Sequence, residues 1–224
     1  MSLPIAVLIS GGGSNLQSII EKMEDNILDV DIRMVLSNKA DAYGLKRAEA
    51  YGIPTSVLNH KDFGSREEFD AEMVRVLKEA GVEAVVMAGF MRIITPVFLN
   101  AFPGKIINIH PAILPSFPGV DGQSEAAEYG VQLAGCTVHF VNEKMDNGAV
   151  IIQAAVPAYP GEKEDDLRER ILKQEHRILP QAIQWLAKER LTIENRFVKL
   201  AEADVAAAER DVFSLVNPPL EKGF

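Results

Sequence analysis

Short apolar runs alternate with amphipathic, charged segments along the first half of the chain. Five runs have the length and β-branched content of buried strands: residues 4–10, 31–38, 54–59, 83–89 and 105–110. Helical periodicity marks three segments between them: residues 15–24, 42–52 and 65–81. Ser65 with Glu68 fits a capping box at the start of the third helix. This order predicts an α/β fold, a mostly parallel twisted sheet with helices on both faces that is Rossmann-like.

The pattern changes near Gly135. Two apolar segments, 136–143 and 149–158, flank a tight turn and predict antiparallel strands added in the C-terminal part. A long helix is expected at 164–190, kinked or broken at Pro180. After it we expect one or two weak strands and a short alanine-rich helix.

Composition limits the classes of protein that this chain could be. The 224 residues are 47% apolar and 25% charged, which suits one globular domain over residues 1–200 with a tail, 201–224, that packs on it or trails from it. The net charge of −9 disfavours a nucleic-acid partner, and no apolar run approaches the ~20 residues of a membrane span. One cysteine and no export signal favour a cytoplasmic protein. Four scattered histidines indicate no metal site.

A glycine loop, SGGGSN at residues 10–15, connects the first expected strand to the first helix. Backbone N–H groups at a helix start attract anions, and glycines let a phosphate approach them. Leu16 stands where a dinucleotide-binding loop has its third glycine, so a phosphomonoester is favoured. Gly13, Ser14 and Asn15 are therefore predicted to bind phosphate. The alternative is a tight turn with Asn15 as the helix N-cap.

Asn108 and His110 stand at the end of the fifth expected strand, in INIHPAILPSFPG. Alternation places both side chains on one face of the strand. The carboxyl ends of strands are where open α/β sheets bind ligands. The alternatives are an Asn108 that hydrogen-bonds the next loop and a His110 that is a buried core histidine.

Six segments occur in a characteristic order: GGGSN, SNKADAYGL, AGFMRI, NIHPAILPSFPG, GCTVHFVNEKMDNG and QEHRILP. Over about residues 4–200 the chain resembles the phosphoribosylglycinamide formyltransferases, the folate-dependent glycinamide ribonucleotide transformylases. They belong to the formyltransferases that use 10-formyltetrahydrofolate. The resemblance implies an enzyme of de novo purine biosynthesis. It would move a formyl group from 10-formyltetrahydrofolate to the amine of N1-(5-phospho-D-ribosyl)glycinamide, giving the N2-formyl product and tetrahydrofolate.

The implied partners are these small-molecule substrates, with the reduced folate as a co-substrate and no tightly bound cofactor or metal. A monomer or a homodimer is expected. Acyl transfer places negative charge on the formyl oxygen, where donors must be waiting. Asn108 and a protonated His110 are expected to be these donors. Asp146, which matches the family's catalytic aspartate, is expected to favour the charged form of His110 and to aid proton transfer.

Several alternatives stay open beside these roles. Asp146 could be only a turn residue, since Asp-Asn-Gly is a strong turn signal. His139 could be a structural, buried histidine near the site. Asp121 stands where the family often has histidine, so it is expected at the mouth of the site or on a surface turn.

The resemblance also assigns the binding residues. Gly13, Ser14, Asn15 and Glu175 would contact the ribonucleotide. The folate-binding residues would be Arg66, Met91, Arg92, Ile93, Ile94 and Asn108. The plainer interpretations are an exposed helix start for Arg66, core packing for the aliphatic residues and a solvated helix face for Glu175.

Two other activities compete with the transferase. Formyltetrahydrofolate hydrolase gives the formyl group to water and usually carries an N-terminal regulatory domain. Methionyl-tRNA formyltransferase usually has a C-terminal domain for tRNA, which the length and acidity of this chain disfavour. A catalytically silent folate- or phosphate-binding module is the remaining alternative.

Overall fold

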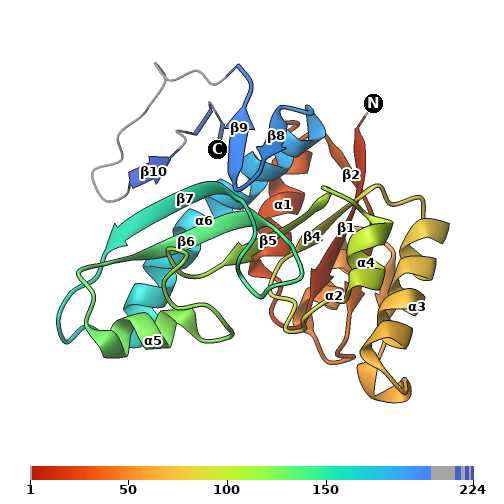
Figure 1. Ribbon diagram of the computed structural model, residues 1–224, viewed down its shortest axis with the longest axis horizontal. Helices are drawn as coiled ribbons and strands as arrows, with labels where there is room; N and C mark the ends of the chain where they lie inside the picture. Colours follow the sequence, from red (N-terminus) through yellow and green to blue (C-terminus); the bar gives the residue numbers. More distant parts are fainter. Residues whose placement is uncertain (1, 203–214, 218–219, 222) are drawn as a thin grey trace. The chain divides into compact units, whose positions relative to one another are not determined.

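The computed structural model describes residues 2–202, 215–217, 220–221 and 223–224 (Figure 1). Its contacts divide the chain into two compact units. The first comprises Met1–Asn108 with Val141–Glu143, and the second Ile109–Phe140 with Lys144–Phe224. The single domain expected over residues 1–200, with its tail at 201–224, stays a prediction.

The first unit contains a parallel sheet with the strand order β3-β2-β1-β4-β5. Its strands are β1 (Leu3–Ile9), β2 (Val30–Ser37), β3 (Thr55–Val57), β4 (Ala84–Met87) and β5 (Ile106–His110). Figure 1 shows β1 between β2 and β4. The last two residues of β5 already belong to the second unit.

Helices cover both faces of this sheet. They are α1 (Ser14–Glu24), α2 (Tyr43–Ala50), η1 (His60–Asp62), α3 (Arg66–Glu79) and α4 (Pro96–Ala101). Leu8 of β1 shares a core with Phe69 of α3 and Phe98 of α4. Ile9, on the opposite face of β1, reaches Gly44 of α2. The strand and helix order agrees with the sequence prediction, except that η1 and α4 are too short to give a periodic pattern.

The predicted capping box starts α3. Ser65 Oγ accepts a hydrogen bond from the Glu68 N–H at 3.1 Å. The Glu68 carboxylate in turn accepts from the Gly64 N–H at 2.9 Å, one residue before the usual partner. These two bonds fix the start of the helix whose buried face carries Phe69 and Asp70.

The second unit is built on antiparallel strands. β6 (Leu133–Phe140) pairs with β7 (Val150–Pro157), as predicted, although β6 begins and ends earlier than expected. β8 (Leu191–Glu194) pairs antiparallel with β9 (Phe197–Leu200), β9 pairs parallel with β7, and β10 (Leu215–Asn217) pairs antiparallel with β7. The predicted fold class, a mostly parallel sheet with antiparallel strands in the C-terminal part, is confirmed.

Two helices complete the second unit, α5 (Gly122–Tyr129) and α6 (Glu164–Ala187). Of the kink or break predicted at Pro180, the break is wrong, because α6 continues through this residue; the kink stays a prediction. The buried face of α6, with Ile171, Ile178 and Ile183, packs against β6 and β7 and compensates for the backbone hydrogen bond that proline cannot donate. None of the described helices combines the length and the apolar character needed to cross a membrane. The expected alanine-rich helix lies outside the described residues.

Candidate active site

A buried carboxylate lies between two buried histidines in the second unit. Asp146 Oδ2 is 3.5 Å from Nδ1 of His110, at the end of β5. Asp146 Oδ1 is 3.6 Å from Nε2 of His139, on β6. The two imidazole rings are 3% and 2% exposed. The structure therefore brings together two of the three predicted catalytic residues, and it adds His139 to them.

The turn that carries Asp146 explains the Asp-Asn-Gly sequence. Asp146 has a φ of 47°, a left-handed conformation that Asp and Asn tolerate better than most residues. A Cβ at Gly148 would overlap the carbonyl oxygen of Phe140, so this position requires glycine. Asp146 is thus both a turn residue and the carboxylate near His110. Its role in the turn does not exclude a catalytic role.

The surroundings of Asp146 favour its ionised form. Burial alone would raise the pKa of this carboxyl. The His139 ring at 3.6 Å, the hydrogen bond from the Gly119 N–H, and the charges of His110 and His139 together outweigh burial and lower the pKa below its ordinary value. Asp146 is therefore an acceptor across the pH range in which enzymes usually work.

Both ring nitrogens of His110 face oxygen atoms that only accept hydrogen bonds. Nε2 lies 2.8 Å from the carbonyl oxygen of Phe117, and Nδ1 faces the ionised Asp146. A neutral imidazole has one N–H and would turn a lone pair toward one of these acceptors. Each ring nitrogen of His110 therefore lies where an N–H would have an acceptor.

Side chains of β6 and β7 hold the loop that follows His110. Thr137 Oγ1 donates to the carbonyl oxygen of Ala112 at 2.7 Å and accepts from the Leu114 N–H at 3.1 Å. Gln153 Nε2 donates to Thr137 Oγ1 and to the Leu114 carbonyl, both at 3.0 Å. The loop is thus tied to the strands near its base, and to Asp146 through the Gly119 N–H.

Sequence reasoning missed Thr137 and Gln153. The available signal was alternation, because Thr137 and His139 lie on the same face of one strand. Asp121, at the N-cap of α5, is exposed and accepts a hydrogen bond from Ser124 Oγ at 2.7 Å. This exposure is compatible with either expectation for Asp121.

The glycine loop lies in the first unit, where Gly13 is the N-cap of α1 with a φ of 71°. The alternative of Asn15 as N-cap is therefore wrong. A Cβ at Gly13 would lie 2.6 Å from the Cα of Gly44, so glycine is needed here for the close approach of α1 and α2. At Gly11 and Gly12 a Cβ would meet nothing within 4 Å, so packing does not explain those two glycines.

The start of α1 presents donors that the described part of the chain does not use. Ser14 is partly buried, and its hydroxyl has no hydrogen-bond partner among the described residues. Arg47 Nε donates to the Gly12 carbonyl at 2.9 Å, which places a positive charge beside the loop. An exposed loop with a helix N-terminus, a hydroxyl and a nearby guanidinium is suited to an anion.

The predicted folate segment, residues 91–94, is irregular chain between β4 and α4. Met91 and Ile93 are 55% and 49% exposed, whereas Ile94 is buried in the core of the first unit. The Arg92 guanidinium carbon lies 5.4 Å from the centre of the Phe69 ring, and its Nε is buried without a hydrogen-bond partner among the described residues. Core packing therefore explains Ile94 but not Met91 or Ile93.

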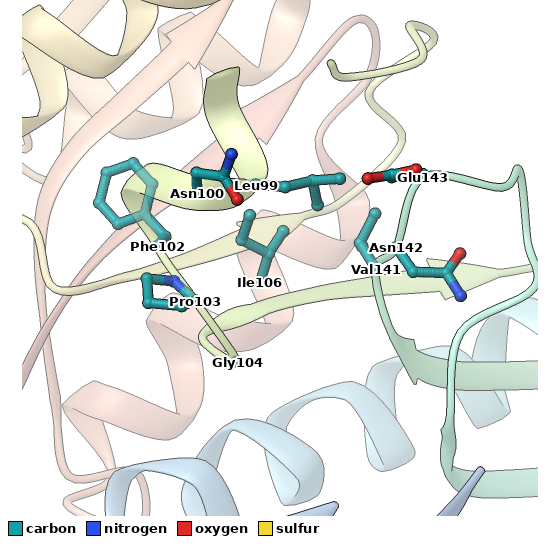
Figure 2. Close-up of a pocket in the computed structure, with 9 residues that line it drawn as sticks. All are labelled: Leu99, Asn100, Phe102, Pro103, Gly104, Ile106, Val141, Asn142 and Glu143. Atoms are coloured by element: carbon teal, nitrogen blue, oxygen red, sulfur yellow. The ribbon is translucent and has the colours of Figure 1, made fainter. Parts of the chain in front are cut away.

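A pocket of about 260 Å³ opens in the first unit, lined by α4, the turn after it, the start of β5 and residues 141–143 (Figure 2). Its walls include the apolar Leu99, Ile106 and Val141. The volume is near the lower end of ordinary ligand pockets, about 300–1,000 Å³, so it suits one small ring rather than a complete folate. Sequence reasoning missed this pocket because its walls come from segments far apart in the chain.

The other predicted binding residues have contrasting environments. Arg66 is the exposed first residue of α3, as its plainer interpretation expects. Asn108 is partly buried and lies opposite Met87 in the pairing of β4 with β5. Glu175 is only 5% exposed, so the solvated helix face proposed for it is wrong. Its charge, after the larger effect of burial, raises the pKa of the Cys136 thiol.

Among the described residues, no group of three or more histidine, cysteine or acidic side chains could hold a metal ion. Gly13, Ser14, Asn15, Arg66, residues 91–94 and Asn108 belong to the first unit. His110, Asp146 and Glu175 belong to the second.

Comparison with known proteins identifies relatives along most of the chain. The phosphoribosylglycinamide formyltransferase of Escherichia coli (strain K12) is 46% identical over 187 residues, which are 84% of this chain and 88% of that protein. The crystal structure of glycinamide ribonucleotide transformylase 1 from Symbiobacterium toebii matches with a TM-score of 0.87 and 46% identity, covering 89% of this chain and 94% of that one.

A third relative is much longer. The trifunctional purine biosynthetic protein adenosine-3 of Drosophila pseudoobscura pseudoobscura is 48% identical over 203 residues, which are 90% of this chain but 15% of that protein. The formyl transferase family itself matches residues 3–183. The predicted resemblance is confirmed at this level, and the chain belongs to the formyl transferase family.

Proposed function

We propose that the chain transfers the formyl group of 10-formyltetrahydrofolate to the amine of N1-(5-phospho-D-ribosyl)glycinamide. The observation that carries this proposal is the ionised Asp146 facing Nδ1 of His110 at 3.5 Å. With His110 protonated, as proposed, this pair would supply a cationic hydrogen-bond donor next to a proton acceptor, which direct acyl transfer to an amine requires. The names of the relatives from Escherichia coli and Symbiobacterium toebii support the choice of substrates.

In the proposed reaction the substrate amine attacks the formyl carbon, and a new C–N bond forms as the carbonyl electrons move onto oxygen. Asn108 and protonated His110 donate hydrogen bonds to this oxyanion. The oxyanion then collapses, the bond from carbon to folate N10 breaks, and N10 gains the proton that the amine loses. Asp146 assists this proton transfer, directly or through one water.

One hydrogen bond must change for His110 to act in this way. Its Nε2–H is directed at the carbonyl oxygen of Phe117. We propose that the formyl oxygen replaces the Phe117 carbonyl as the acceptor of this N–H. The Asp146 contact at Nδ1 would be kept, so the ring would stay charged during the exchange.

Gly13, Ser14 and Asn15 are proposed to bind the phosphate of the ribonucleotide, and Glu175 to contact its ribosyl part. Support comes from the Ser14 hydroxyl without a partner in the described chain and from Arg47 beside the loop. Arg66, Met91, Arg92, Ile93, Ile94 and Asn108 are proposed to bind the folate. Its flat ring requires apolar contacts with nearby backbone donors and acceptors, which an exposed irregular segment offers.

The reduced folate would act as a co-substrate, not as a resident cofactor. We propose that the protein works in the cytoplasm as a monomer or a homodimer, and no step of the reaction requires a metal.

A mixed assay tests the proposal. The purified chain is incubated with 10-formyltetrahydrofolate, with and without glycinamide ribonucleotide, and both tetrahydrofolate and the formylated product are quantified. Tetrahydrofolate formation that depends on the ribonucleotide, with an equal amount of formylated product, is the expected result. Release of formate without the ribonucleotide would instead identify a hydrolase. Binding of both ligands without turnover would identify a silent module.

A further inference from the structure

The segment of residues 91–94 is held at its two ends by buried side chains that are absent from the predicted site. At the first end, the Met91 N–H donates to Ser10 Oγ at 2.9 Å. Ser10 is 5% exposed, and its hydroxyl donates to Asn38 Oδ1 at 2.6 Å. Its own N–H donates to the Gly89 carbonyl at 3.0 Å. Ser10 therefore fixes the chain on both sides of Phe90.

At the other end, the Thr95 N–H donates to Asp70 Oδ2 at 2.5 Å. Asp70 is 2% exposed and projects from the buried face of α3. Burial raises its pKa, which the hydrogen bonds of Thr95 and the charge of Arg92 only partly oppose. An acidic side chain that is costly to bury is thus used to fix one backbone N–H.

Between these two points the backbone has no hydrogen-bond partner in the part of the chain that the structure describes. No hydrogen bond from a described residue reaches the N–H or C=O groups of Arg92, Ile93 or Ile94. Backbone groups without partners are usually solvated or used by a ligand. A ligand that hydrogen-bonds to these backbone groups binds more tightly when the segment already has a single conformation. Ordering a loose segment on binding would cost free energy.

We propose that Ser10 and Asp70 are positioning residues for folate recognition, which hold the ends of the 91–94 segment so that its backbone is preorganised for the folate ring. The inference rests on the proposed function, since it takes the segment to be the folate contact. Neither side chain needs to touch the ligand. Each acts through one backbone N–H, at Met91 and at Thr95.

The test compares Ser10→Ala and Asp70→Leu with the wild type. Loss of one hydrogen bond at either end should raise the KM for 10-formyltetrahydrofolate about three- to tenfold. The KM for the ribonucleotide should stay within about twofold of the wild type. Hydrogen exchange measured by mass spectrometry should become faster in peptides that cover residues 88–95, a readout that needs no activity.

Two matched variants separate positioning from general stability. Ser37→Ala removes another buried serine of the first unit, whose hydroxyl bonds, among the described residues, only to the backbone of Lys39 at 2.9 and 3.0 Å. It should leave the folate KM and the exchange of residues 88–95 unchanged. Asp70→Asn keeps an acceptor for the Thr95 N–H without the charge, and it should restore most of the folate affinity that Asp70→Leu loses.

The possible results distinguish a failure of the positioning role from a failure of the proposed function on which it rests. If the wild type binds no tetrahydrofolate, the proposed function fails. Faster hydrogen exchange of residues 88–95 in the variants would still support the inference that Ser10 and Asp70 hold the two ends of the segment. An active wild type with an unchanged folate KM in Ser10→Ala and Asp70→Leu would overturn the positioning role. A rise in both KM values, or an equal effect of Ser37→Ala, would overturn it as well.

Discussion

His110 Nδ1 and the Gly119 N–H share one oxygen of Asp146, at 3.5 and 2.8 Å. The carboxylate therefore faces the histidine and holds the following loop at the same time. Asp146→Asn keeps the shape but removes the charge, so the protonated fraction of His110 at neutral pH should fall. We expect kcat to drop roughly 10²–10³-fold, the cost of losing one oxyanion donor, with small changes in KM.

The check is steady-state kinetics together with an NMR titration of the His110 ring. A matched variant is Asp121→Asn, which removes an exposed carboxylate of the same unit and should leave kcat within a few-fold of the wild type. An unchanged His110 titration in Asp146→Asn would show that the carboxylate acts only by holding the loop.

The hydroxyl of Ser14 gives a second prediction. Ser14→Ala removes a donor at the start of α1 that no described residue uses, so the fold should lose little stability. The KM for the ribonucleotide should rise about tenfold, since hydrogen bonds to charged groups contribute about 1.5–3 kcal/mol. The KM for the folate should not change.

Ser18→Ala is the control for this experiment. Ser18 lies one turn further along α1, is buried, and donates to the Asn15 carbonyl at 2.8 Å. Loss of this hydroxyl should lower the thermal stability of the protein and leave the ribonucleotide KM close to that of the wild type. An equal rise of that KM in both variants would remove Ser14 from the phosphate site.

Thr137 gives a prediction about stability. Thr137→Val preserves the shape of the side chain but leaves the Ala112 carbonyl, the Leu114 N–H and part of the Gln153 amide without their partner. The free energy of unfolding should fall by about 1–3 kcal/mol, measured with urea. Thr192→Val, on the exposed face of β8, should change it by less than about 0.5 kcal/mol.

Asp70 and Asp146 should make stability depend on pH in opposite directions. The pKa of Asp146 is lowered from 3.8, so its contribution is present above that value and is lost as the pH falls through the folded-state pKa. The pKa of Asp70 is raised from 3.8, so the wild type loses stability as the pH rises from that value to the folded-state pKa.

Urea unfolding of Asp146→Asn, Asp70→Asn and the wild type between pH 3 and 7 measures both effects. The free energy of unfolding of the wild type should exceed that of Asp146→Asn near neutral pH, and this difference should shrink toward low pH. Relative to Asp70→Asn, the wild type should become less stable toward higher pH. Parallel curves for all three proteins would contradict both assignments.

Local patterns predicted the elements and part of the site. Alternation and turn signals placed the strands of the first unit, and His110 with Asp146 followed from a strand end and a turn that match a family. The hydrogen bonds of Ser10 with Met91 and of Asp70 with Thr95 join residues 81 and 25 positions apart. Such bonds leave no periodic trace in the sequence, because serine and aspartate also occur at many turns and helix caps.

Packing explains the remaining differences between the sequence predictions and the structure. Pro180 is an expected helix breaker, yet α6 continues because its apolar face is buried. Glu175 stands on a helix rich in charges and nevertheless lies in the interior. Charge patterns assign polar residues to the surface by default, so a buried carboxylate is recognised only from its three-dimensional surroundings.

The single cysteine of the chain has a practical consequence for labelling. Cys136 is fully buried in β6, and burial with the charge of Glu175 keeps its thiol protonated. Thiolates react with maleimides and thiols do not, so the native protein should resist such reagents. A fluorophore or spin label could therefore be attached to a cysteine introduced on the surface without removing Cys136. Slow modification of Cys136 itself would then record, as a mass increase over hours, how often the interior of the second unit opens to solvent.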